Sequence, residues 1–245
     1  MTPDLKRPFS LTAVITVLTA VAGIISVLFF SPFFGISLDF AKMSLFSLLI
    51  ISAVILWAIA RLKEGVLTLP QSLPALAMAG IVCATVLSAL LSPAAHSSFF
   101  GAGYETTTGI ATIMLALSFF LAYLFIRTPK NVSLLYGGFI AVMFIIGLYE
   151  AVRLIFGPGV LSFGIFENLL SNPIGKWNDL ALLYGLLGAI SLLAVSSFSP
   201  RGAVRTVLYI SYGLSLLALF IANFSLAWWL FAFSAVAKSP GRKRL

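Results

Sequence analysis

The sequence predicts an all-α, polytopic integral membrane protein with about eight transmembrane helices and both termini in the cytoplasm. Hydrophobic residues make up 61% of the 245 positions and charged residues 9%, too few charges to cover a soluble protein of this size. The second observation is the placement of Lys and Arg, which gather at every second boundary between apolar runs. We therefore expect residues 1–245 to form a single transmembrane helical domain.

The basic residues give the predicted orientation, because Lys and Arg are retained on the cytoplasmic side of spanning helices. Three of the fifteen, Lys42, Arg153 and Lys176, fall on the opposite, outer side. That side also holds five of the seven acidic residues. The other twelve basic residues form the predicted cytoplasmic clusters Lys6/Arg7, Arg61/Lys63, Arg127/Lys130, Arg201/Arg205 and Lys238/Arg242/Lys243/Arg244.

The apolar runs give the spans in order. The first resembles a cleavable signal peptide as far as Ala22, but its apolar character continues to Phe30 and favours an uncleaved span. The third is bounded by Pro70/Pro74 and Pro93, which limit helices. The predicted spans are 10–30, 43–60, 73–91, 108–126, 132–155, 180–196, 207–222 and 226–237.

The last two spans need separate justification. Residues 207–237 are long for one span and short for two. A single tilted helix would place the terminal basic cluster outside, against the positive-inside bias. Two helices joined by the polar break Asn223-Phe224-Ser225 satisfy it, so we predict two helices, the second of them short.

Composition also excludes several functions. The net charge of +8 comes from residues scattered over short loops, which argues against a nucleic-acid partner. Cys83 is the only cysteine, and the chain has no CxxC or His/Cys cluster, so we predict no intrachain disulfide, metal or cofactor. No ionisable residue lies near the middle of a predicted span, which disfavours an ion-coupled transporter.

Three outer segments hold the candidate functional residues. The first runs from His96 to Gly109 and contains Glu105. It is either an interfacial loop anchored by aromatic side chains or one wall of a site for a polar headgroup. Hydroxyls of Thr106 to Thr108 can cap the helix that follows. His96, the only histidine, is either solvated or a general base.

The second and third segments lie at the two ends of the longest outer loop. Glu150 and Arg153 share a helix face and can pair, or Arg153 can bind a phosphate through its guanidinium. In the third segment Asn178 or Asp179 can cap the next helix, whose first amides and Lys176 then form a plausible anion site. The alternative for that segment is an interfacial anchor at Trp177.

Three stretches, in this order, resemble the O-antigen ligase and polymerase superfamily of bacterial membrane proteins. They are the loop Ser98-Phe99-Phe100-Gly101 to Glu105-Thr106-Thr107, the stretch Asn172-Pro173-Ile174-Gly175-Lys176-Trp177-Asn178-Asp179 and the turn Asn223-Phe224-Ser225-Leu226-Ala227-Trp228-Trp229. The turn is similar to the family's small-polar Ser-Arg-Gly-Ala-Trp pattern, with Leu226 where an arginine is usual.

The resemblance implies metal-independent, inverting transfer of a glycan from a polyprenyl-diphosphate carrier to an acceptor sugar. The reaction would occur at the outer face of the bacterial cytoplasmic (inner) membrane and serve polysaccharide biosynthesis in the cell envelope. Arg153 and Lys176 would bind the diphosphate, with Glu105, Glu150, Asn178 and Asp179 in support. The family's large outer loop and last helices have no counterpart here, so we expect a truncated product, or half of a split protein with a partner chain that supplies the outer loop.

Two other functions compete with the enzyme. A small transporter or flippase-like carrier needs a polar path through the helices, for which the spans offer only Ser, Thr, Asn and Tyr. A non-catalytic membrane subunit needs no chemistry of its own. Membrane lipid is a partner in all three cases.

Overall fold

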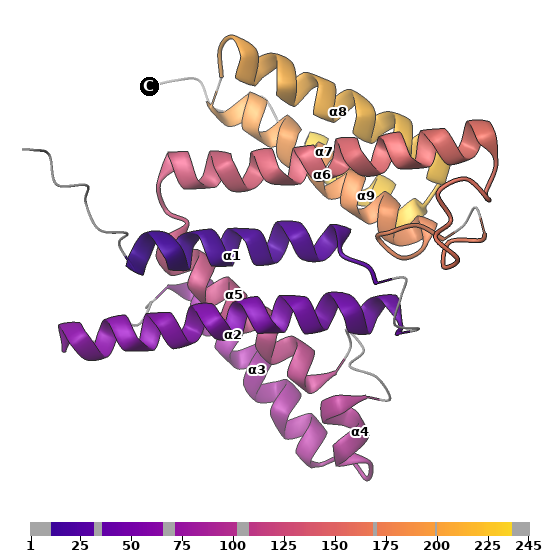
Figure 1. The fold of residues 1–245 in the computed structure, drawn as a ribbon. Helices are drawn as coiled ribbons and strands as arrows, with labels where there is room; N and C mark the ends of the chain where they lie inside the picture. The colour runs from indigo at the N-terminus through magenta and orange to yellow at the C-terminus, as the bar shows by residue number, and fades with distance from the viewer. Residues whose placement is uncertain are drawn as a thin grey trace, which may run out of the picture. The chain divides into compact units, whose positions relative to one another are not determined.

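The computed structural model describes residues 11–31, 36–65, 72–101, 108–168, 171–198 and 200–236, and these are helical apart from turns and one isolated bridge between Ser171 and Lys176 (Figure 1). The helices are α1 (Leu11–Leu28), α2 (Leu38–Glu64), α3 (Leu73–Leu90), α4 (Ala95–Phe100), α5 (Gly109–Phe125), α6 (Pro129–Phe156), α7 (Trp177–Phe198), α8 (Ala203–Ala222) and α9 (Ser225–Val236).

Six of the helices within the described ranges are long and apolar enough to cross a membrane: α1, α2, α3, α6, α7 and α8. Helix α5 is apolar but has 17 residues, and α9 has 12, which is short of the roughly 20 that a span needs. Helix α4 lies in a segment for which only a loop or a site wall was predicted from the sequence. The prediction of a helical, multi-pass membrane protein is confirmed, while the count of eight spans stays a prediction.

Short polar side chains fix where several helices begin. Ser37 accepts a hydrogen bond from the backbone N–H of Phe40 at the start of α2, and Ser72 does the same for Ala75 at the start of α3. Thr108 accepts from the backbone N–H of Ala111 at 3.3 Å, which confirms the predicted threonine cap of α5.

Asn223 separates α8 from α9. Its backbone is left-handed, with φ 46° and ψ 44°, a conformation that ends a helix and that Asn tolerates better than most residues. The two helices predicted for the 207–237 stretch are thus confirmed. The reason is local, because a residue in this conformation cannot continue the right-handed helix.

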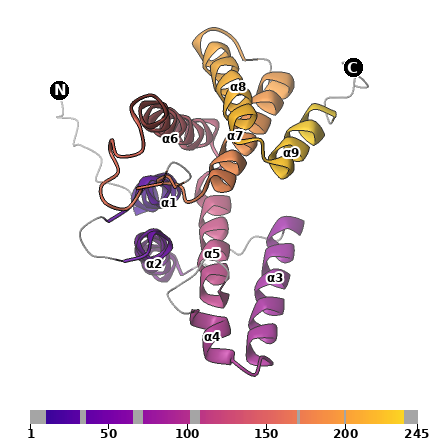
Figure 2. The same cartoon turned by 90° about the vertical axis from the view of Figure 1, so that its right-hand side faces the viewer.

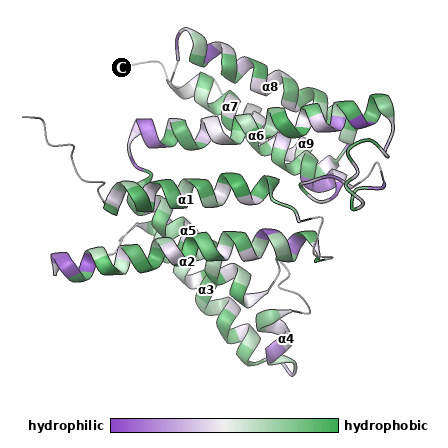
Figure 3. Ribbon diagram, viewed as in Figure 1, coloured by the Kyte–Doolittle hydropathy of each residue, from purple (hydrophilic) through white to green (hydrophobic). Residues whose placement is uncertain are grey.

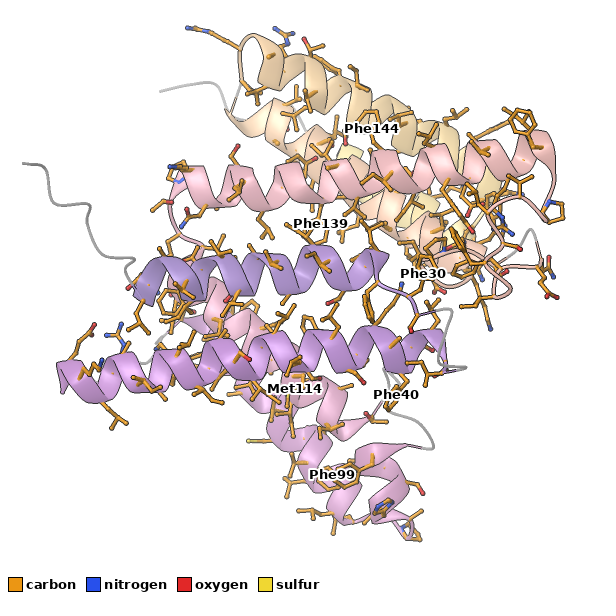
Figure 4. All side chains as sticks on the ribbon, in the orientation of Figure 1. Phe30, Phe40, Phe99, Met114, Phe139 and Phe144 are labelled. Atoms are coloured by element: carbon orange, nitrogen blue, oxygen red, sulfur yellow. The ribbon has the colours of Figure 1, made fainter. Side chains whose placement is uncertain are left out.

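The chain divides into two compact units, Met1–Gly137 and Gly138–Leu245, and the boundary falls within α6. In the first unit α1, α2 and α5 contact one another, α3 packs along α5, and α4 contacts both α3 and α5 (Figure 2). The core between α1, α2 and α5 includes Ile15, Ile50 and Leu121, all fully buried. Met114, labelled in Figure 4, packs against this core from α5.

In the second unit α7 contacts both α8 and α9 (Figure 2). Ala181, Leu219 and Ala227 form its buried cluster, one residue from each of these helices. The hydroxyl of Ser191 on α7 lies 3.1 Å from that of Ser211 on α8, within hydrogen-bond distance. Interhelical bonds of this kind support helix packing in membranes, where water does not compete for them.

Hydrophobic residues predominate along the helices (Figure 3), and many of their large apolar side chains are exposed. Only 6% of the residues of α3 are buried, and the side chain of Leu87 on that helix is 59% exposed. A soluble protein does not leave helix faces of this size in water. The hydropathy and burial of these helices therefore define a multi-pass membrane protein.

Candidate functional site

The buried side chain of Arg153 organises the loop between α6 and α7. Arg153 lies in the last turn of α6 and has no exposed surface. Its Nη1 donates to the carbonyl of Ser171 at 2.6 Å, and its Nη2 donates to the carbonyls of Phe166 at 2.6 Å and Asn168 at 2.8 Å. Charge-assisted hydrogen bonds are roughly twice as strong as neutral ones. One guanidinium thus fixes three points of the loop.

Tyr149, one turn before Arg153 on α6, supports the same loop. Its hydroxyl donates to the carbonyl of Leu161 at 3.0 Å, and its ring meets that of Phe166 edge to face, with centroids 6.2 Å apart. The guanidinium carbon of Arg153 lies 5.3 Å from the centroid of the Tyr149 ring, within cation–π range. Tyr149 and Arg153, four residues apart near the C-terminal end of α6, therefore both hold the loop that follows this helix.

Asn172 shapes the turn that leads into α7. It is fully buried, and its Oδ1 accepts hydrogen bonds from the backbone N–H groups of Ile174 at 2.9 Å and Gly175 at 3.1 Å. The backbones of Asn172 and Gly175 also exchange two hydrogen bonds, at 3.1 and 3.0 Å. An Asn side chain that bonds residues two and three positions on is a typical stabiliser of a tight turn.

Asp179 lies in the first turn of α7, which begins at Trp177, and supports the helix start from inside, whereas the sequence predicted it or Asn178 as the cap residue before the helix. Its Oδ2 accepts from the backbone N–H of Lys176 at 2.8 Å, and this oxygen would lie 2.6 Å from a Cβ added at Gly175. Gly175 also has φ +153°, so this arrangement needs glycine for space as well as for conformation. Asn178 lies exposed in the first turn of the helix. The side chain of Lys176 is exposed beside them.

Glu150 lines an apolar cavity at the same helix end, and both of its carboxylate oxygens are buried. The cavity measures about 350 Å³ and is lined by α6, α7 and α8, with Phe144 (labelled in Figure 4), Gly147 and Trp177 among its residues. Glu150 is 5% exposed and supplies the only charged side chain in that lining. Its Oε1 lies 3.7 Å from Arg153 Nη1, so the predicted ion pair is present.

The remaining predicted residues lie elsewhere or outside the described ranges. His96 is exposed on α4 in the first unit, and its ring centroid is 5.1 Å from that of Phe100. Arg153, Glu150, Lys176, Asn178 and Asp179 all belong to the second unit. Glu105 is not among the described residues. The structure thus brings together the residues of the second and third predicted segments.

Among the residues of this region that were not predicted as site residues are Phe166, Asn172 and Tyr184. Asn172 stands directly before Pro173, a pair typical of turns, so its role in the loop could have been inferred. Phe166 is 1% exposed, and Tyr184 donates its hydroxyl hydrogen to the carbonyl of Met143 at 2.7 Å. Neither has a local sequence signal, because both depend on contacts with residues at least 13 positions away.

The fold and the site define a multi-pass helical membrane protein with a buried Arg–Glu pair beneath an ordered loop. A comparison with protein-family models gives no match to the chain, and comparisons with curated proteins and with solved structures give none either.

Proposed function

We propose that the protein is an O-antigen ligase-like transferase of the bacterial cytoplasmic membrane. It moves a glycan from a polyprenyl-diphosphate carrier to an acceptor at the outer membrane face, in cell-envelope polysaccharide synthesis. The observation that carries this proposal is the exposed side chain of Lys176. This residue directly precedes α7 and lies on a segment that Arg153 holds in place. The resemblance of residues 172–179 to that family supports the same assignment.

The chemistry of Lys176 suits a diphosphate. Its ammonium is exposed, and its own backbone N–H is already bonded to Asp179. The start of a helix carries a partial positive charge, which adds to the attraction of the lysine for an anion. Because the basic clusters orient the chain, Lys176 faces the outer side, where a lipid-linked glycan is consumed in this proposal.

Arg153 has a positioning role in the proposal. The three carbonyls that it binds surround a fully buried guanidinium, so a phosphate reaches it only if the loop moves. The direct diphosphate contact predicted for Arg153 stays a prediction. In the structure as it stands, Lys176 is the accessible cation of this segment and Arg153 holds the loop that ends at it.

The test is binding and release of the carrier in lipid nanodiscs that contain the full chain. With a fluorescent polyprenyl diphosphate, Lys176→Gln should weaken binding about tenfold, because one charge-assisted contact is lost. Lys176→Arg should retain binding, and Arg201→Gln, a matched loss of one exposed charge in the same unit, should leave it unchanged.

Transfer is measured as release of polyprenyl diphosphate from the glycan-loaded carrier when an envelope glycolipid fraction is added as acceptor. Full binding and full release by Lys176→Gln would show that this site is wrong. Carrier crossing the bilayer of sealed vesicles that contain the full chain, without release, would favour the flippase-like alternative. Binding without release or crossing would favour a non-catalytic subunit.

A further inference from the structure

The loop between α6 and α7 presents an apolar surface that plays no part in the proposed transfer (Figure 1). Residues 157–166 of this loop include no charged side chain. Four large apolar side chains in residues 160–165, here called the apolar loop segment, are exposed: Val160 by 38%, Leu161 by 45%, Phe163 by 49% and Ile165 by 39%. Single exposed apolar residues are ordinary on a protein surface, whereas four within six consecutive positions mark an interaction surface.

The exposure of this segment is built into the backbone of the loop. Leu161 and Phe163 have left-handed backbones, with φ 57° and 51°, a conformation that bulky residues keep only where the surrounding structure holds them. The Tyr149 hydroxyl donates to the carbonyl of Leu161 at 3.0 Å. The Ser162 carbonyl accepts from the backbone N–H groups three and four residues on, at 3.0 and 2.8 Å. The loop is therefore folded with Phe166 buried and the apolar loop segment outside.

The same apolar surface begins on the spanning helix before the loop. Leu154, Ile155 and Phe156 in the last turn of α6 are 47%, 73% and 69% exposed. With 28 residues, α6 is about 42 Å long. A hydrocarbon core measures about 30 Å, and the headgroup regions extend the bilayer to about 40–45 Å. A helix that starts at one surface of the bilayer thus ends inside the opposite headgroup region, and the loop starts there.

We propose that the apolar loop segment inserts into the leaflet in which α6 ends and anchors the loop there, with Leu161 and Phe163 at the boundary between headgroups and acyl chains. Lipid is the partner because the segment continues the apolar surface of a spanning helix and offers no charge to a protein partner. Glu167, the first charged residue after the segment, is exposed and marks the return of the loop to water.

Quenching of a fluorophore from the lipid side and from the water side tests this proposal. In a Cys83→Ser background, Val160→Cys, Phe163→Cys and Glu167→Cys carry the same small fluorophore, one per protein. The full chain is placed in phosphatidylcholine nanodiscs, which expose both membrane faces to aqueous iodide. Burial of one large apolar side chain already favours the inserted loop by about tenfold or more, so iodide should quench positions 160 and 163 about tenfold less than position 167. A nitroxide near the top of the lipid acyl chain should quench 160 and 163 more than 167.

A charge within the segment tests what drives the insertion. Leu161→Asp replaces the apolar side chain by a charged one that tolerates the left-handed backbone. It should raise iodide quenching of the probe at position 163 to the level seen at 167. Asn168→Asp adds the same charge at an exposed position outside the segment and should leave the probe at 163 shielded.

Three results would each overturn the proposal. The first is equal iodide quenching at positions 160, 163 and 167, which would place the segment in water. The second is shielding from iodide without quenching by the lipid nitroxide, which would show that protein covers the segment. The third is a probe at 163 that stays shielded in Leu161→Asp. If that variant does not fold, the comparison of the three probe positions decides.

Discussion

Arg153 shows how one residue can carry several roles that sequence spacing alone does not separate. The spacing of three from Glu150 predicts a pair, and the structure has it at 3.7 Å. The same side chain also binds three loop carbonyls, and its Nε has no hydrogen-bond partner. Loss of this residue removes both the charge balance of Glu150 and the anchor of the loop, and the two effects can be measured apart.

We expect Arg153→Leu to destabilise the second unit by about 3–5 kcal/mol, because it leaves a buried carboxylate uncompensated. The double variant Glu150→Leu with Arg153→Leu removes that charge as well and should recover part of the stability. In this double variant the amide hydrogens of residues 157–168 should still exchange faster than in the wild type, because the loop carbonyls have lost the guanidinium that donates to them. Thermal unfolding and hydrogen exchange measure the two quantities.

The matched control is Arg201→Leu, which removes an exposed arginine from the same unit. It should change neither the thermal stability nor the hydrogen exchange of the loop. If the double variant restored the slow exchange of the loop, Arg153 would act by balancing Glu150 and not by holding the loop.

At the scale of the helices, the Tyr184 side chain of α7 reaches α6 beside one glycine. A Cβ added at Gly147 would lie 2.7 Å from the Tyr184 hydroxyl oxygen, the atom that donates to the carbonyl of Met143 at 2.7 Å. A contact of that length cannot persist, so the position of the Tyr184 hydroxyl requires a residue without a side chain at position 147. The hydrogen bond crosses between helices in an apolar setting, where such bonds contribute about 0.6 kcal/mol on average.

Gly147→Ala should therefore lower stability by about 1–3 kcal/mol, the usual range for overpacking. Tyr184→Phe removes the clashing oxygen and leaves the ring carbon 3.9 Å from the new methyl group, an ordinary contact. The double variant should unfold at the same temperature as Tyr184→Phe alone or slightly above it, because alanine favours helix over glycine once the clash is gone.

Gly137→Ala is the control on the same helix, because nothing lies within 4 Å of its added Cβ. It should be neutral or stabilising by about 0.5–1 kcal/mol, as alanine favours helix over glycine. Additive losses in the Gly147 and Tyr184 double variant would show that the two residues do not interact.

The whole molecule depends on an orientation that the charge pattern predicts. We expect Glu167 to be outside and Arg201 to be cytoplasmic, and both are exposed. In a Cys83→Ser background, Glu167→Cys should react with a membrane-impermeant maleimide on intact cells. Arg201→Cys should react only after the cells are permeabilised, because the bilayer lies between it and the reagent.

The Cys83→Ser protein without a new cysteine supplies the blank for both measurements. Labelling of Arg201→Cys but not of Glu167→Cys on intact cells would show that the topology is the inverse of the predicted one. Lys176 would then face the cytoplasm, and the proposed reaction at the outer face would fail with it.

Hydrophobic length predicts most of the helices, because a span of about 20 apolar residues is visible in one dimension. Thr108 and Asn223 mark two boundaries for local reasons, a hydroxyl cap and a left-handed residue. Helix α4 was missed because its six residues are too few to show a hydrophobic period. Lys176 was predicted beside the start of a helix that Asn178 or Asp179 caps, and the hydrogen bond that joins Lys176 to Asp179 is equally local.

The sequence by itself determines a helical membrane protein, the positions of its apolar helices and the i,i+3 pair of Glu150 and Arg153. Only the tertiary structure decides that Arg153 is enclosed by the carbonyls of Phe166, Asn168 and Ser171, and that Glu150 lines a cavity shared with α7 and α8. The physical reason is range. Hydropathy and caps act over a few residues, whereas the donors and acceptors that surround a buried charge come from segments that only folding brings together.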